Sequence, residues 1–111
     1  MASTADKLSK YLVPGETVEH AMAANWETGG RTVPALVGIT RRRLVVVQRV
    51  MGFGQPQTAA VDLASVVEVQ TGGGLSGTVV LRTGGGSVVS LKAVRGGDLR
   101  AIQGAVAAAR G

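Results

Sequence analysis

The segment VVEVQTGGGLSGTVVLRTGGGSVVSLKAVRGGDLRAIQGAVAAAR, residues 66–110, decides the fold of this chain. Three short runs rich in valine and leucine, at residues 66–71, 78–82 and 87–92, are separated by the glycine-rich stretches GGGLSG and TGGG. Short apolar runs between glycine-rich turns are typical of antiparallel strands that are joined by hairpins. We therefore expect three such strands here.

The end of the same segment predicts an amphipathic helix. Asp98 follows two glycines and is expected to be the N-cap, because its carboxylate can accept a hydrogen bond from the first free N–H groups. The residues that recur on one helical face are Leu99, Ile102, Ala105, Val106 and Ala109. Gly104 lies within this helix and costs about 1 kcal/mol relative to alanine, so we expect it to mark a close approach of helix to sheet.

Four further strands are expected before this segment, at residues 17–28, 32–39, 43–50 and 58–62, with a tight connection at residues 63–65. Pro34 lies near the start of the second of these strands. Proline has no N–H to donate to a strand ladder, so Pro34 predicts an edge position or a strand start.

A short helix is expected over residues 1–13, ahead of Pro14. Its apolar residues Leu8, Tyr11 and Leu12 fall at the spacing of one helical face. The seven expected strands leave these side chains without a place in the core. We therefore expect this helix to pack across a subunit boundary.

Length and composition favour one domain, residues 14–111, after that helix. The absence of cysteine and the single histidine exclude disulfides and thiolate metal sites, and we expect no metal and no cofactor. No apolar run has bilayer length and no secretory signal is evident, so the expected location is the cytoplasm. The net charge of +5 favours anionic partners.

Seven strands followed by one helix is the element order of the pleckstrin-homology (PH) superfold, and four stretches carry a closer resemblance. They are LVPGETVEHA at residues 12–21, GITRRRLVVV at 38–47, VDLASVVEVQTGG at 61–73 and TVVLRTGGGSVVSL at 78–91. In their order and spacing the chain resembles a bacterial PH-like domain of the YokE-like type. The resemblance implies a mainly β fold, a seven-stranded, strongly bent antiparallel sheet or partly open barrel with a C-terminal amphipathic helix. It also implies an intracellular module that often self-associates, and no catalytic residues.

Arginines supply the candidate binding residues. Arg41, Arg42 and Arg43 form a run of like charge at a strand-to-strand turn, where they could meet a phosphate-bearing surface or form a solvated hairpin tip. Arg31 and Arg49 are added to this candidate anion- or lipid-binding set. A second candidate feature is the apolar loop residues Met51 and Phe53, which could contact a lipid interface or a protein partner, or fold back onto the sheet.

Other motifs do not support catalysis. The GxGxxG pattern of Gly72, Gly74 and Gly77 lies between two expected strands, whereas a dinucleotide site requires a helix after it, so it is interpreted as a hairpin turn. His20 has no cysteine, aspartate or second histidine near it in sequence and is interpreted as structural. No nucleophile and base occur at a recognised spacing.

The sequence therefore predicts a non-enzymatic PH-like binding or assembly module that contacts a protein partner or itself, as a homo-oligomer. The alternative is a peripheral binder of anionic lipid headgroups or other polyanions, through weak membrane contact at the turn 41–43. With three aromatic residues, the chain lacks the stacking platforms of single-strand nucleic-acid binders, and no small-molecule substrate is evident.

Overall fold

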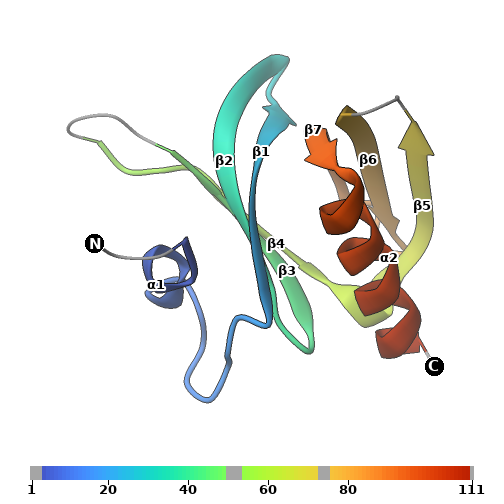
Figure 1. Cartoon of the computed structure of the whole chain (residues 1–111), viewed down its shortest axis with the longest axis horizontal. Helices are drawn as coiled ribbons and strands as arrows, with labels where there is room; N and C mark the ends of the chain where they lie inside the picture. Colours follow the sequence, from blue (N-terminus) through green and yellow to red (C-terminus); the bar gives the residue numbers. More distant parts are fainter. Residues whose placement is uncertain (1–3, 50–53, 73–75, 111) are drawn as a thin grey trace.

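The structure is a computed structural model that describes residues 4–49, 54–72 and 76–110 (Figure 1). Its elements are α1 (Thr4–Ser9), β1 (His20–Thr28), β2 (Arg31–Ile39), β3 (Arg43–Gln48), β4 (Thr58–Asp62), the 3-10 helix η1 (Leu63–Ser65), β5 (Val66–Gly72), β6 (Ser76–Thr83), β7 (Val88–Arg95) and α2 (Gly96–Arg110). The expected order of strands and helices is confirmed. Boundaries move by a few residues, most clearly in β1, which begins at His20 rather than at residue 17.

The strands form one antiparallel sheet in the order β4-β3-β2-β1-β7-β6-β5. β1 pairs with β2 over its whole length, but its pairing with β7 is limited to residues 25–27 of β1 and 90–92 of β7. The sheet bends at this short junction, so that its two halves curl around a common interior and α2 lies against the second half (Figure 1). β4 and β5 are linked by η1 and are the two free edges of this half-barrel. The expected bent sheet with a C-terminal helix is confirmed.

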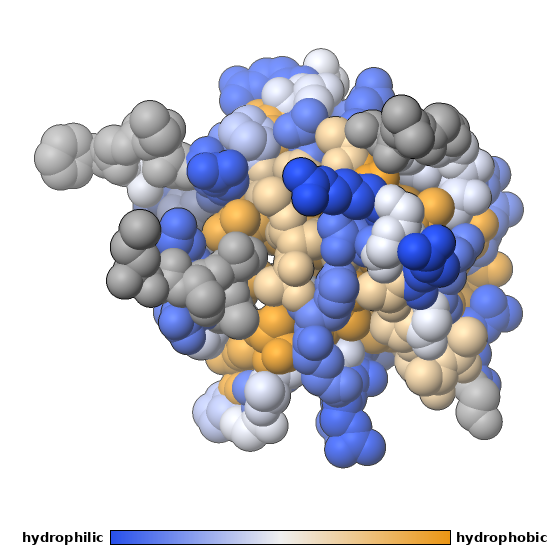
Figure 2. Space-filling model, in the orientation of Figure 1, coloured by the Kyte–Doolittle hydropathy of each residue, from blue (hydrophilic) through white to orange (hydrophobic). Residues whose placement is uncertain are grey.

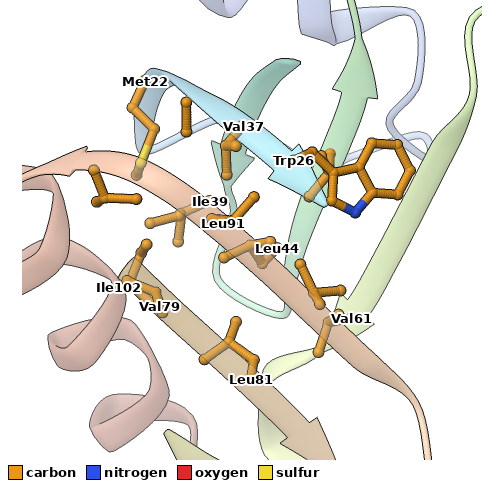
Figure 3. Packing of buried hydrophobic residues seen from close by; sticks show 14 of the residues in the cluster. Met22, Trp26, Val37, Ile39, Leu44, Val61, Val79, Leu81, Leu91 and Ile102 are labelled. Atoms are coloured by element: carbon orange, nitrogen blue, oxygen red, sulfur yellow. The ribbon is translucent and has the colours of Figure 1, made fainter. Parts of the chain in front are cut away.

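The main core lies on the inner face of the bent sheet (Figure 3). Side chains alternate along a strand, so every second residue of β1 points inward, and Met22, Ala24 and Trp26 are buried. Ile102 and Val106 of α2 close the core from the other side, as their helical spacing predicts. The aliphatic packing compensates for the shortage of aromatic residues.

A second, smaller cluster lies on the outer face of the sheet and holds α1 in place. Leu8 of α1 is completely buried against Val45 and Val47 of β3, with Tyr11 beside them. Gly38 of β2 makes room for it, since a Cβ atom there would lie 2.9 Å from Leu8 Cδ1. The apolar face of α1 therefore covers the chain's own sheet. The premise that its apolar residues have no place within the chain is wrong for Leu8, because sequence spacing shows an apolar face but not what covers it. A contact of α1 across a subunit boundary stays a prediction.

Two expectations for the C-terminal helix are also wrong. α2 begins at Gly96, so Asp98 lies in the first turn rather than at the N-cap. Gly104 is exposed, and a Cβ atom there would meet nothing within 4 Å. A helical glycine marks either a close approach or a solvent-facing position, and the sequence alone does not separate the two.

Pro34 lies in β2, which is a central strand between β1 and β3. The expectation of an edge strand is therefore wrong. Pro34 nevertheless lies at the end of the β2–β3 pairing, where its lack of an N–H costs little. The last β2–β3 pair is Ala35 with Gln48, and the Pro34 carbonyl accepts a hydrogen bond from the N–H of Arg49 just beyond it, at 2.9 Å. The nitrogen of Pro34 points to the same side of β2 as its carbonyl, towards β3. Its missing N–H therefore falls where the β2–β3 pairing ends.

Within the described residues, neither helix is long and apolar enough to span a bilayer.

Candidate functional site

The β2–β3 turn is organised by Thr40, a buried polar residue. Its hydroxyl oxygen accepts hydrogen bonds from the backbone N–H groups of Arg42 and Arg43, at 3.2 and 2.9 Å. The same hydroxyl donates to Glu16 Oε2 at 3.0 Å. A threonine hydroxyl that caps nearby N–H groups favours a tight turn over continued strand. The turn is therefore held in one conformation, and its side chains are presented from a fixed backbone.

Arg43 and Glu16 form a two-point ion pair behind this turn. Arg43 Nε lies 2.9 Å from Glu16 Oε2 and Arg43 Nη2 lies 2.6 Å from Oε1, while the N–H of Val13 donates to Oε1 at 3.1 Å. The Glu16 side chain is only 8% exposed. The hydrogen bond from Arg43, with smaller contributions from Val13 and Thr40, outweighs desolvation and lowers the pKa of Glu16 from 4.5 to about 2. Arg43 thus fastens the segment before β1 to the β2–β3 turn.

Arg41 and Arg42, in contrast, are exposed, and neither side chain has an ion-pair partner among the described residues. Both line a surface hollow of about 690 Å³, whose other walls come from residues 13–17, Glu19 and Thr40. The exposed carboxylate of Glu19 in this wall opposes part of their positive charge. The run of three arginines is thus divided into one structural residue and two free ones.

The other two predicted arginines lie at the far end of the same hairpin. Arg31 begins β2 and Arg49 follows β3, whereas Arg41 and Arg42 lie beyond the opposite end of both strands. β2 has nine residues, which at about 3.3 Å per residue separates the two ends by about 30 Å. The structure therefore does not bring the five arginines together. The apolar loop residues Met51 and Phe53 lie outside the described residues.

A basic groove, not predicted from the sequence, runs between α1 and the outer face of the sheet. Lys7, Lys10 and Tyr11 line one side and Arg49 the other, and the groove has a volume of about 660 Å³. Its apolar floor and rim are completed by Pro34, Leu36, Val47 and Pro56. Figure 2 shows hydrophobic surface beside α1, next to hydrophilic groups. The sequence signal that could have indicated this groove is the pair Lys7 and Lys10, three positions apart before the expected end of the first helix.

His20 and Asp98 are brought together from positions 78 residues apart. His20 Nε2 lies 2.8 Å from Asp98 Oδ1, which links the start of β1 to the first turn of α2. No hydroxyl or thiol of the described residues bonds to the same imidazole, so the pair lacks a nucleophile. The interpretation of His20 as structural stays a prediction, and its partner Asp98 could not be found from local sequence.

Comparison with known proteins shows the fold. No family model matches the chain, and no curated protein matches it by sequence. Among solved structures, the C-terminal domain of an unknown protein from Leishmania infantum matches with a TM-score of 0.68 at 10% identity, covering 92% of this chain and 90% of that one.

The DH/PH domains of PDZ-RhoGEF, solved in complex with GTP-γ-S activated RhoA, match with a TM-score of 0.64 at 14% identity, and those of p115-RhoGEF with 0.58 at 12%. This chain is covered to 97% and 96% by these two matches, but it spans only 34% of either fragment. The match shows that the chain has a PH-like fold, as the sequence resemblance implied.

Proposed function

We propose that this chain is a non-catalytic binding module that associates with a second copy of itself through the free edge of β5. The observation that carries this proposal is the length and composition of that edge. β5 has seven residues and no proline, and its Val67 is 61% exposed. A β-bulge at Val67 interrupts the pairing with β6, but residues 68–72 pair regularly beyond it. Regular edge strands without proline pair readily with another strand.

The other edge is less suited to pairing. β4 has five residues, and its outward positions carry short or polar side chains. On β5, the charged side chain of Glu68 is turned back onto Arg82 of β6 in a 3.1 Å ion pair, which leaves Val67 as the prominent apolar group. Two copies paired antiparallel through β5 would form a symmetric contact and extend the sheet across both molecules.

Light scattering of the purified chain over a range of concentrations tests this proposal. We expect a dimer that persists at high salt, because backbone pairing and apolar contact are not screened. Val67→Lys should shift the chain to monomer, since a lysine on an edge strand opposes pairing. Val88→Lys is the matched control, because Val88 is a 51% exposed valine on β7, which is not an edge strand. A monomeric wild-type chain at all concentrations would refute the proposal.

The proposal extends to family and location. We place the chain with the bacterial YokE-like PH domains, on the order and spacing of the four stretches that carry the resemblance. Two of these stretches contain Glu16, Thr40 and Arg43, which interlock in the structure. We also assign the module to the cytoplasm, because its sequence has no cysteine and so cannot form the disulfides on which many small secreted domains depend.

A second candidate function is weak binding of anionic headgroups by Arg41 and Arg42. The observation that favours it is that both guanidinium groups are exposed on a turn fixed by Thr40. Two basic residues contribute about 2 kcal/mol at an anionic surface, so attachment would need a further contact. Co-sedimentation with phosphatidylserine vesicles should decrease in the double variant Arg41→Ala/Arg42→Ala and not in Arg31→Ala. Equal sedimentation of wild type and double variant would exclude this function.

A further inference from the structure

We propose that the basic groove between α1 and the outer face of β2 and β3 binds an acidic segment of a partner protein, with an apolar side chain of that segment on the groove floor. This site is separate from the β5 edge, which lies at the end of the sheet in the other half of the half-barrel. The proposal therefore stands independently of self-association.

The groove exists because α1 covers only part of the outer face. Leu8 is held over Gly38 and Val45, near the β2–β3 turn. Farther along the same strands, the half-buried Leu36 and the exposed Pro34 remain accessible. The volume of about 660 Å³ lies within the range of about 300–1,000 Å³ that is usual for ligand pockets. The floor can thus accept an apolar side chain at an already formed surface.

The charges around this floor have one sign. Lys7, Lys10 and Arg49 line the groove, and among the residues that the structure describes no lining residue carries a carboxylate. The Lys10 ammonium lies 5.3 Å from the Tyr11 ring centroid, which favours a position at the groove rim. The hollows beside the Thr40 turn differ, because Glu16, Glu19 and Asp62 line them together with the arginines. Charge complementarity therefore favours an acidic peptide at the groove over one at the turn.

The shape favours a peptide over a membrane. A lipid surface is met by groups that project from a protein, whereas here the half-buried Leu36 and the buried Val47 are recessed between α1 and the strands. A polypeptide segment is narrow enough to enter this hollow. Its glutamates or aspartates can reach the cations on both sides while one apolar side chain contacts Leu36.

Fluorescence anisotropy of a fluorescein-labelled peptide, Glu-Glu-Leu-Glu-Leu-Glu-Glu, titrated with the full chain tests the proposal. We expect saturable binding that weakens with salt and becomes at least about tenfold weaker in Lys7→Glu/Lys10→Glu. The matched control is Arg41→Glu/Arg42→Glu, which changes the net charge by the same amount, and its affinity should stay within about twofold of wild type. A peptide with serine in place of both leucines should bind several-fold more weakly.

Each other outcome overturns the proposal. Equal weakening by the two charge-reversal variants would show attraction to the net charge alone, and no saturable binding would show that the groove is not a peptide site. Vesicles of phosphatidylserine that bind through Lys7 and Lys10 while the peptide does not would assign the groove to a membrane. Circular dichroism of both variants, with Lys7→Gln/Lys10→Gln as a milder pair, separates loss of binding from loss of folding.

Discussion

The Thr40 turn and the basic groove each carry three cationic side chains, yet the structure uses them differently. At the turn, Arg43 is joined to the nearly buried Glu16 by two hydrogen bonds, and Glu19 faces the remaining two arginines. At the groove, Lys7, Lys10 and Arg49 surround an apolar floor, and no carboxylate of the described part of the chain lines it. The turn is the denser cluster in sequence, and the groove is the more positive surface in space. The ion-pair partners of a cation, more than its neighbours in sequence, therefore decide whether it can bind a ligand.

The largest effect should come from Arg43→Ala, which removes the ion pair between Arg43 and Glu16 at the turn. It leaves Glu16 almost buried without its charged partner, and we expect a loss of about 2–3 kcal/mol in the free energy of unfolding. Urea denaturation measures this loss. Arg82→Ala is the matched control, because its ion pair with Glu68 is about half exposed on both sides and should contribute less than about 1 kcal/mol. Equal losses would mean that burial does not distinguish the two pairs.

Acid should weaken the same contact more gradually. The folded-state pKa of Glu16 is lowered to about 2 from an ordinary value of 4.5, so the carboxylate stabilises the fold above pH 4.5. This contribution is lost as the pH falls from about 4.5 towards 2, and partial exposure of Arg43 limits it to about 1–2 kcal/mol. Urea midpoints at pH 6 and pH 3 should differ less in Glu16→Gln than in wild type. An unchanged difference would place the acid sensitivity elsewhere.

Gly38→Val should affect the groove rather than the turn. The added Cβ would lie 2.9 Å from Leu8 Cδ1, so the Leu8 side chain must shift, which weakens the packing of α1 on the sheet. We expect a cost of about 1–2 kcal/mol, limited by the free energy of α1 docking, together with weaker peptide binding. Gly84→Val is the control, because its Cβ would meet Val67 Cγ1 at an ordinary 3.7 Å. Peptide affinity that survives Gly38→Val would show that α1 does not form the groove wall.

The smallest effect should come from Arg41→Ala/Arg42→Ala. Both side chains are exposed and without ion-pair partners among the described residues, so their removal should change the free energy of unfolding by less than about 0.5 kcal/mol. Urea denaturation of this double variant and of Arg43→Ala, measured in parallel, compares the free energies of unfolding lost by the two. A loss close to that of Arg43→Ala would contradict the division of the run into structural and free residues.

Local patterns were enough to predict the order of strands and helices along the chain and the buried face of α2. The alternation of Met22, Ala24 and Trp26 and the spacing of Ile102 and Val106 record which side of each element is buried. Patterns of this kind do not show which residues pack against the buried side. The helix predicted over residues 1–13 ends at Ser9, so of its expected face only Leu8 is helical, while Tyr11 and Leu12 follow in a turn. The contact of Leu8 with Val45 was not foreseen.

The contacts at the candidate sites could not be predicted for a related reason. Glu16 and Arg43 are 27 residues apart, and His20 and Asp98 are 78 apart, so only the folded sheet brings them together. Lys7 and Arg49 line one groove because α1 packs on the outer face of the sheet. A run such as Arg41–Arg43 is conspicuous in sequence because its charges are adjacent, although adjacency does not show which side chain is already neutralised.

Nuclear magnetic resonance most directly tests the claim that an acidic peptide binds the groove and not the arginine turn. The acidic peptide would be titrated into the ¹⁵N-labelled chain while backbone amide shifts are followed. We predict that the largest shifts occur at Lys10, Leu36 and Arg49, with little change from Thr40 to Arg42. Shifts concentrated at Thr40–Arg42, with the groove unaffected, would contradict the account.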